Sequence, residues 1–467
     1  MPFNSLYFAI FMLFVVGGYW ALGSWRARKL FLLGASWFFY ATWSPRFLLV
    51  LIATTWVDFH LAHVIYRRRW NDDGTERPGG RARARGLLAL SLVMNLGLLA
   101  VFKYSAFLYD GAASVFGLGP MPRALALVLP LGISFYTFHS ISYVVDTYRG
   151  LRPPTASFPD FALYVAFFPQ LIAGPITRWG FFGPQLDRPR RVDLDGVEAA
   201  LFLVATGLIK KVVCADSLGA FVDVIYDPLS RPAQIETWLA FYAYAFQIYF
   251  DFSGYTDMAW GLAGLLGFRL PVNFRHPYLA ENPREFWQRW HVSLSTWLRD
   301  YLYVGLGGNR RGALRTHANL IVTMVLGGLW HGAAWTFVLW GAYHGVWLSL
   351  HRLVSGRPPE TPAWLRRLVT FHLVSIGWVL FRSPTLAMAG SVLGGLFVPH
   401  PLDGGLPIAP IALVLAGVAT HALSLRVDLR DVWRSVPRVA QGMVYGVVVI
   451  AIGLFGAQTQ RFIYFQF

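Results

Sequence analysis

One stretch of the chain is long, apolar and free of formal charge, and it decides the class of fold. It reads Leu320-Ile-Val-Thr-Met-Val-Leu-Gly-Gly-Leu-Trp-His-Gly-Ala-Ala-Trp-Thr-Phe-Val-Leu-Trp340. No Asp, Glu, Lys or Arg occurs between Thr316 and His351. A membrane-spanning helix needs roughly 20 mostly apolar residues. The stretch therefore predicts helix at membrane depth, as one long helix or two short ones, with Gly327-Gly328 and Gly332 as possible breaks.

The composition of the whole chain agrees with this interpretation. Hydrophobic residues make up 56% of the 467 residues and charged residues only 14%, whereas soluble domains average about 25% charged. A chain with so few charges cannot cover itself against water, so lipid must solvate much of its surface. Only helices and closed barrels satisfy their backbone groups in lipid. We expect an all-α, polytopic membrane bundle in a single domain.

Similar apolar runs recur along the chain, and they predict about eleven spanning helices. These predicted spans cover residues 5–23, 30–44, 47–66, 87–109, 123–145, 195–225, 233–266, 316–351, 365–382, 406–424 and 439–459. Within the single domain 1–467 we distinguish N-terminal helices (1–150), a catalytic core (158–351) and C-terminal helices (352–467).

Two segments of the predicted core do not fit a clean crossing. Residues 158–177 are apolar but contain Phe168-Pro-Gln170 and Gly174-Pro175, which favours a broken or re-entrant helix. Residues 269–315 carry eight arginines and several prolines among aromatic residues. We expect short amphipathic or re-entrant helices there, packed at the cytoplasmic side of the bundle.

The net charge of +16 is distributed as membrane topology requires. Five consecutive loops alternate in basicity, from the arginine-rich loop around Arg67-Arg-Arg69 to the segment 110–120, which has no Lys or Arg. Basic loops stay in the cytoplasm, so the N-terminus is predicted outside. This distribution argues against nucleic-acid binding. The single cysteine, Cys214, excludes an intramolecular disulfide framework.

His331 is the polar group that this apolar stretch accommodates least well. An ionisable side chain at membrane depth is costly and is a functional-site hypothesis by default. Trp330 and Trp335 can wall a narrow channel around it, and an imidazole can take a proton from an attacking hydroxyl. The alternative is a structural histidine hydrogen-bonded between helices. Position alone leaves these two readings equally open.

A second histidine lies in Phe286-Trp-Gln-Arg-Trp-His-Val-Ser-Leu-Ser-Thr-Trp-Leu-Arg-Asp-Tyr301. His291 can face the same cavity from the cytoplasmic side and orient a thioester carbonyl, although an interfacial histidine is the simpler reading. Trp287 and Trp290 are candidates to line the cavity. Guanidinium groups match phosphate oxygens, and the candidate phosphate ligands are Arg289, Arg299 and Arg310, with Arg284 and Arg311 nearby. Topology alone would also place arginines here.

A third polar cluster interrupts the apolar run Phe246–Met258. It contains Gln247, Asp251, Tyr255 and Asp257, and Asp251 and Tyr255 share a helical face. We expect structural pairing with arginines of 269–315 rather than catalysis. No Cys/His cluster has zinc spacing, and no phosphate-binding loop of the Gly-Lys-Ser/Thr type occurs. His344 and His351 are predicted to be packing or interfacial residues.

Several long motifs resemble the membrane-bound O-acyltransferase family. They are Trp287–Tyr303, Leu306-Gly-Gly-Asn-Arg310, Gly327–Trp335, Phe167–Pro175, Tyr249–Tyr255 and the terminal Phe462-Ile-Tyr-Phe-Gln-Phe467. The similarity extends over nearly the whole chain. It is greatest to the bacterial branch that O-acetylates exported polysaccharides such as alginate.

The resemblance implies roles that spacing does not show. It places the catalytic histidine at His331 and the second active-site histidine at His291, beside a tunnel through the membrane. It implies acetyl-CoA as acyl donor with no bound cofactor or metal, a bacterial inner-membrane location, and a separate periplasmic or surface protein that completes the transfer.

The final acceptor stays open at this stage. Alginate, another exopolysaccharide, peptidoglycan and other envelope glycans are all compatible with the resemblance. A proton-coupled transporter with an intramembrane histidine is the rival class of protein, and a scaffold without activity is a third reading.

Overall fold

Helices form almost all of the regular structure in the computed structural model, which describes residues 1–119, 121–122, 127–354, 361–402, 405–427, 429–455 and 462–463. Within these ranges no strand occurs, and Trp70 and Glu76 form an isolated bridge. The all-α prediction is confirmed. Of the terminal motif, Phe462 and Ile463 are described, and the other four residues lie outside the described ranges, as do 123–126 and 456–459 of two predicted spans.

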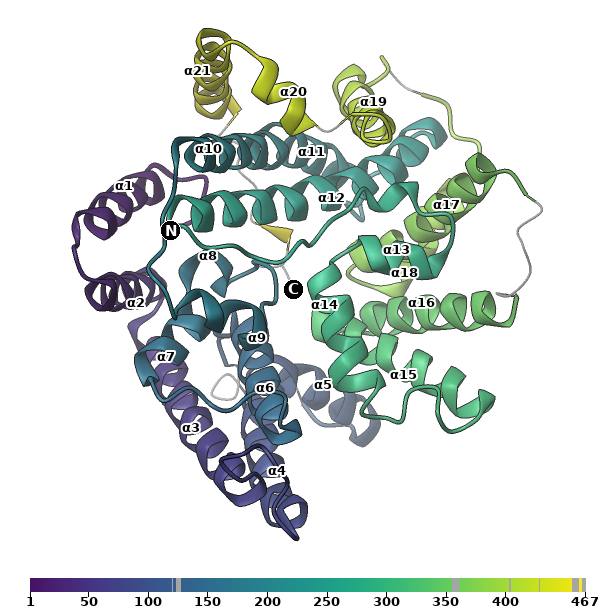
Figure 1. Ribbon diagram of the computed structural model, residues 1–467. Coiled ribbons are helices and arrows are strands. Elements are labelled where there is room, and N and C mark those ends of the chain that lie inside the picture. Colours follow the sequence, from purple (N-terminus) through teal and green to yellow (C-terminus); the bar gives the residue numbers. More distant parts are fainter. Residues whose placement is uncertain are drawn as a thin grey trace. The chain divides into compact units, whose positions relative to one another are not determined.

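The chain divides into two compact units. The first comprises Met1–Ala200 and Ala259–Pro271, and the second comprises Leu201–Met258 and Val272–Phe467. Two helices, α10 (Leu194–Leu208) and α12 (Gln234–Leu265), which are labelled in Figure 1, contribute residues to both units. Both predicted active-site histidines belong to the second unit.

The first unit is built on packed helices at its N-terminal end. Its elements are α1 (Leu6–Ala21), α2 (Trp25–Ala41), α3 (Pro45–Arg69), α4 (Gly80–Leu99), the π-helical turn η1 (Ala100–Tyr104), α5 (Ser105–Phe116), α6 (Ile133–Arg149), α7 (Phe158–Ala166), α8 (Phe168–Leu171) and α9 (Trp179–Phe182). The buried carboxylate of Asp58 on α3 accepts hydrogen bonds from Ser91 and Asn95 on α4. Buried polar groups need such partners, so this contact fixes the register of α3 against α4.

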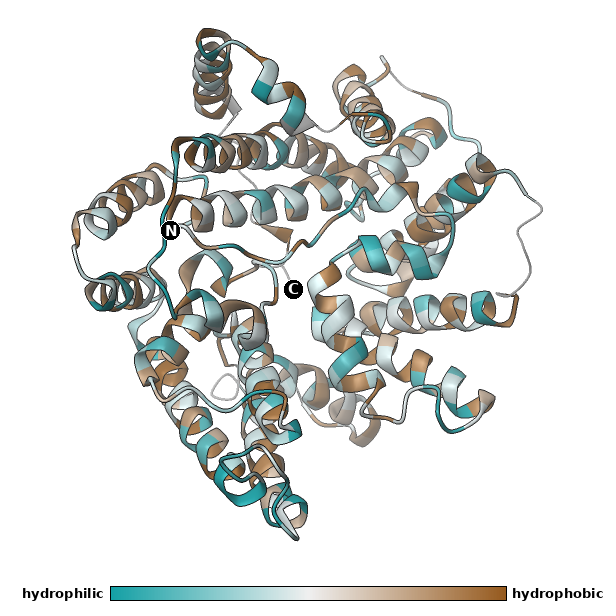
Figure 2. Ribbon diagram, viewed as in Figure 1, coloured by the Kyte–Doolittle hydropathy of each residue, from teal (hydrophilic) through white to brown (hydrophobic). Residues whose placement is uncertain are grey.

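The second unit carries the segment with the candidate site. After α10 and α12 its helices are η4 (Ile209–Ala215), α11 (Asp216–Ile225), η5 (Pro277–Leu279), α13 (Pro283–Arg289), α14 (Val292–Trp297), η6 (Leu298–Tyr303), α15 (Ala313–His331), α16 (Trp335–Val354), α17 (Ala363–Arg382), α18 (Leu386–Gly395), α19 (Ile408–Leu423), α20 (Leu429–Ser435) and α21 (Arg438–Phe455). The short elements α13, α14 and η6 confirm the expected short helices within 269–315. Figure 2 shows α13 as strongly hydrophilic beside more apolar neighbours.

The lengths of the apolar helices agree with a membrane protein. Among the described residues, three helical segments are long and apolar enough to cross a membrane: Pro45–Arg69, Gly80–Phe116 and Ala363–Arg382. Four shorter apolar helices, Leu6–Ala21, Leu386–Gly395, Ile408–Leu423 and Arg438–Gly453, accompany them. The total of about eleven spans remains a prediction.

The structure resolves the irregular segments that the sequence left open. The run 316–351 forms two helices that separate at Gly332, whereas Gly327 and Gly328 stay inside α15. The predicted break in 158–177 is confirmed, because α7 ends at Ala166 and Phe167 leaves the helical conformation.

One predicted boundary is wrong. The span expected from residue 123 begins only at Ile133, after Pro130 and after Gly132 with φ 73°. Proline lacks an N–H group for a helix, and a left-handed glycine ends regular backbone on its N-terminal side. Residues 127–131 are apolar, so a prediction based on composition extended the span through both breaks.

Candidate active site

Three glycines bring α15 and α16 close together and so position His331. A Cβ atom at Gly328 would lie 2.2 Å from the Phe337 carbonyl oxygen, and one at Gly341 would lie 2.3 Å from the Met324 carbonyl oxygen. One at Gly345 would lie 2.8 Å from the Ile321 Cα. Gly341 and Gly345 form the small-xxx-small pattern of tightly packed membrane helices. The close hairpin places His331, the last residue of α15, against the start of α16.

His331 is enclosed by aromatic rings. Its imidazole is buried, and its ring centroid lies 5.0 Å from that of Trp330, 5.2 Å from Trp340 and 5.1 Å from Phe381. Trp340 and Phe381 meet it edge to face. These rings come from α15, α16 and α17. The enclosure is apolar, and such surroundings strengthen electrostatic interactions with any reacting group inside.

His291 is held in an unusual backbone conformation. It has φ 42° and immediately precedes α14, and it is buried. The next two residues are fixed by Asn273: the Val292 N–H donates to the Asn273 carbonyl, and the Ser293 hydroxyl donates to Asn273 Oδ1 at 2.8 Å. A left-handed conformation at a residue other than glycine costs energy and often marks a functional site.

The two histidine rings lie near each other. Their centroids are 6.5 Å apart, and the interplanar angle is 55°. His291 also meets Phe252 of α12 edge to face at 4.5 Å. At this separation one small group between the rings can contact both. The prediction that His291 and His331 share one site is thus matched by the geometry, while their catalytic roles remain predictions.

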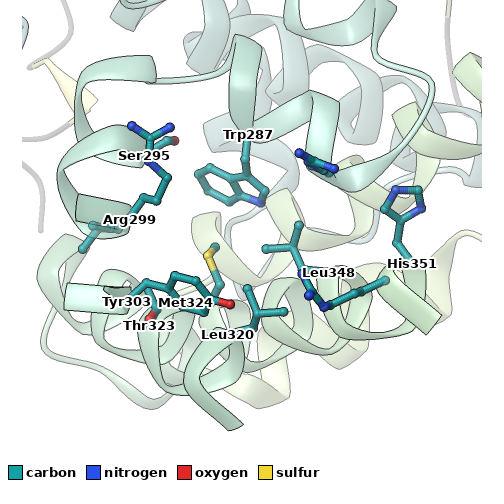
Figure 3. Close-up of a pocket in the computed structure, with 12 residues that line it drawn as sticks. Trp287, Ser295, Arg299, Tyr303, Leu320, Thr323, Met324, Leu348 and His351 are labelled. Carbon is teal, nitrogen blue, oxygen red and sulfur yellow. The ribbon is translucent and has the colours of Figure 1, made fainter. Parts of the chain in front are cut away.

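A cavity of about 300 Å³ lies in the same unit, and neither His291 nor His331 is among the residues that line it. Its lining comes from five elements: Arg284 and Trp287 (α13), Ser295 (α14), Leu298, Arg299 and Tyr303 (η6), Leu320, Thr323 and Met324 (α15), and Leu348, His351 and Arg352 (α16). Figure 3 shows the Trp287 indole pointing into the cavity between Ser295 and His351. The cavity thus combines three arginines with an aromatic face.

A single side chain connects the cavity wall to His331. Trp287 packs edge to face on Trp340 at 5.7 Å, and Trp340 also packs edge to face on His331 at 5.2 Å. Trp340 is almost completely buried. The cavity wall and His331 therefore share one buried aromatic neighbour, Trp340.

Acidic side chains hold α13 in place beside the cavity. Asn282 caps the helix by accepting a hydrogen bond from the Glu285 N–H. Glu281, in the loop before α13, binds both Arg366 and Arg367 of α17, with 3.0 Å to Arg367. Hydrogen bonds from Arg366 hold the pKa of the Glu281 carboxyl below its usual value. These contacts tie the loop before α13, the helix that carries Trp287, to α17.

The other predicted site residues lie in varied surroundings. Trp290 is buried and packs on Trp378 at 4.7 Å, away from the cavity lining. Trp335 is 64% exposed at the start of α16. Of the three predicted phosphate ligands, Arg299 lines the cavity and pairs with Asp300. Arg289 pairs with Glu285 in the same helix, and Arg310 is exposed outside the cavity.

Sequence reasoning missed a histidine and an arginine of the cavity lining. His351, predicted as a packing or interfacial residue, and Arg352 both line the cavity from the last turn of α16. The available signal was position: His351 follows Leu348 by three residues and so shares its helical face. In the described part of the chain, no group of three or more His, Cys, Asp or Glu side chains is placed to hold a metal ion.

One predicted pairing is wrong. Asp251 was expected to pair with an arginine of 269–315, but its carboxylate lies 2.7 Å from Lys211 Nζ. Asp257 likewise pairs with Lys210 at 2.6 Å. The reason is helix packing, because η4 lies against α12 and brings both lysines to its carboxylates. Their structural rather than catalytic role stays a prediction.

The fold and site define a helical membrane protein with two histidines enclosed near a cationic cavity. Comparison with known proteins identifies the class further. Residues 152–379, which include both histidines, match the family model for membrane-bound O-acyltransferases. The probable alginate O-acetylase AlgI of Pseudomonas syringae pv. tomato is 43% identical over 401 residues, covering 85% of this chain and 75% of that protein.

More distant relatives act on other envelope polymers. The peptidoglycan O-acetyltransferase of Helicobacter pylori is 38% identical over 433 residues, covering 84% of this chain and 79% of that protein. The teichoic acid D-alanyltransferase of Bacillus subtilis is 26% identical over 274 residues, covering 55% and 69%. The chain belongs to the membrane-bound O-acyltransferase family and is an O-acyltransferase. The transporter reading is thereby set aside.

Proposed function

We propose that this protein takes an acetyl group from cytoplasmic acetyl-CoA and passes it across the membrane for O-acetylation of an exported polysaccharide such as alginate. The observation that carries the proposal is the arrangement of His331 and His291, which lie together and are linked through Trp340 to Trp287 in the wall of a cavity lined by arginines. The similarity to alginate O-acetylases supports the choice of acyl group and polymer.

The cavity suits the chemistry of coenzyme A as the donor substrate. The donor carries phosphates, and Arg284, Arg299 and Arg352 line the cavity. Guanidinium groups bind phosphate oxygens by paired hydrogen bonds. The Trp287 indole offers a flat face for a nucleobase. The thioester end of the donor would then be directed toward Trp340 and His331.

The two histidines have distinct tasks in this proposal. His331 accepts the proton of the acceptor hydroxyl as its oxygen attacks the thioester carbonyl. The carbon–sulfur bond breaks, and the departing thiolate takes up a proton to leave as free coenzyme A. His291, on the far side of the small gap between the rings, orients the carbonyl. The apolar enclosure excludes water, which would otherwise hydrolyse the thioester.

A second acceptor is favoured by a specific observation. The peptidoglycan O-acetyltransferase of Helicobacter pylori aligns over nearly as much of this chain as the alginate O-acetylases do. Peptidoglycan is therefore the alternative polymer. In either case we propose an inner-membrane location with the N-terminus outside, and a separate periplasmic or surface protein that delivers the acetyl group to the polymer.

The direct test is the acetyl content of exported polysaccharide and of peptidoglycan in cells that carry wild type, His331→Ala or His291→Ala. We expect His331→Ala to abolish acetylation of one polymer, because general-base catalysis contributes about 10²–10⁴-fold. His60→Ala, which alters an exposed histidine on α3, serves as the matched control and should leave acetylation unchanged. Equal acetylation in all four strains, at equal membrane levels of protein, would refute the proposal.

A further inference from the structure

A buried ion pair lies inside the second unit, away from the cavity. Lys211 Nζ lies 2.7 Å from Asp251 Oδ1 and 2.7 Å from Asp216 Oδ1, and all three side chains are at most 7% exposed. Gly207 and Gly254 allow the approach, since a Cβ at Gly254 would lie 2.8 Å from the Gly207 carbonyl oxygen. Burying charges is expensive even when they are paired. Net stabilisation therefore does not by itself explain why these charges are buried.

The second oxygen of Asp251 binds a distant part of the chain. The Ile463 N–H donates a hydrogen bond of 2.8 Å to Asp251 Oδ2. Phe462 and Ile463 are both buried. The Phe462 ring lies 4.7 Å from that of Tyr255, one helical turn along α12. Asp251 thus holds the Phe462–Ile463 segment by its backbone, and aromatic packing holds it by a side chain.

This docked segment reaches the candidate active site through one ring. Phe462 lies 6.1 Å from Phe252, and Phe252 meets His291 edge to face at 4.5 Å. Phe252 follows Asp251 directly in α12. Phe462, which docks beside Asp251, therefore packs on Phe252, and Phe252 packs on the strained His291. A change in how the segment docks would alter the support behind the His291 ring.

We propose that Lys211 and Asp251 are positioning residues, which dock the Phe462–Ile463 segment on α12 and so hold Phe252 against His291. The charge of Lys211 favours the ionised form of the buried carboxylate, and an ionised carboxylate is a stronger acceptor for the Ile463 N–H than a neutral group. The part of this inference that concerns the rate of reaction rests on the proposed function. The docking itself does not.

The first experiment measures docking without using activity. In a Cys214→Ser background, Ile463→Cys places one thiol on the segment and leaves the Ile463-position N–H intact. We expect slow maleimide labelling in the purified protein and labelling at least ~10-fold faster after Asp251→Ala, because labelling follows local opening of the segment. Asp251→Asn retains an acceptor oxygen and should restore most of the protection.

The matched control is Asp257→Ala, which breaks the neighbouring Lys210 pair on the same helix without touching the segment. It should change labelling by less than about twofold. If Asp257→Ala accelerates labelling as much as Asp251→Ala does, the effect is general loosening and the docking proposal is wrong. If Asp251→Ala leaves labelling slow, it is equally wrong.

The second experiment measures catalysis with the native Ile463. Asp251→Ala and Phe462→Ala should lower kcat at least ~10-fold, with KM for acetyl-CoA nearly unchanged, because the donor cavity is not altered. Asp251→Asn should recover part of kcat. Fast labelling with unchanged kcat would overturn the positioning role. Absence of acetyl transfer by wild type would instead contradict the proposed function, and the labelling result would still decide whether the segment docks.

Discussion

At the scale of single residues, the two histidines of the site are placed by different means. His331 ends a regular helix, and its apolar neighbours in sequence already suggested a buried position. His291 owes its place to a left-handed backbone held by Asn273. Among the described residues other than glycine, only His276 and His291 have positive φ. No sequence pattern announces this conformation at a histidine, so the structure alone supplies that detail.

Variants at Arg352 and Arg310 distinguish binding of the donor in the cavity from a general effect of positive charge. Arg352 lines the cavity, whereas Arg310 is exposed outside it. We expect Arg352→Ala to raise KM for acetyl-CoA about tenfold with kcat little changed, because a lost phosphate contact weakens binding of the donor equally in ground and transition states. Arg310→Ala should have little effect. Steady-state kinetics with purified protein measure both, and equal effects would contradict the assignment of the cavity to the donor.

At the scale of elements, the glycines of the α15–α16 hairpin have two different roles that composition does not distinguish. The uncharged run 316–351 was consistent with one helix or two, with Gly327-Gly328 and Gly332 as possible breaks. Only Gly332 acts as one. Gly328 and Gly341 instead let the two backbones touch. A glycine that breaks a helix and one that permits close packing look alike in sequence, because the difference depends on the neighbouring helix.

Substitution of Gly341 tests this packing. A Cβ there would overlap the Met324 carbonyl oxygen, and neither backbone can move away without opening the hairpin. We expect Gly341→Ala to destabilise the protein by about 1–3 kcal/mol, the usual cost of overpacking, and to reduce activity. Gly442→Ala in α21 meets nothing within 4 Å and should be neutral or slightly stabilising. Thermal unfolding in detergent compares them, and identical melting temperatures would refute the packing argument.

At the scale of the whole molecule, the distribution of charge predicts the orientation in the membrane. The loop Asn71–Gly79 lies between α3 and α4 in the arginine-rich region, and Gly119 lies in the segment after α5 that has no Lys or Arg. The positive-inside rule puts the first loop in the cytoplasm and the second outside.

This orientation is open to a direct test. In the Cys214→Ser background, Gly119→Cys should react with a membrane-impermeant maleimide in cells with a permeabilised outer membrane, and Asp73→Cys should react only after the inner membrane is broken. The two positions serve as controls for each other. The reverse pattern would show that the N-terminus is cytoplasmic and that the cavity arginines face the wrong side for cytoplasmic acetyl-CoA.

The sequence by itself determined that lipid solvates much of the surface and that the fold is helical. It also determined the two motifs that carry His291 and His331. Those properties follow from composition and from local runs of residues. They do not depend on how other segments of the chain pack. Only the tertiary structure decided that Asp251 pairs with Lys211, that Arg352 rather than Arg310 lines the cavity, and that Trp340 contacts both the cavity wall and His331. Each of these depends on how segments distant in the chain pack, and side-chain partners across helices follow from backbone approach rather than from spacing along the sequence.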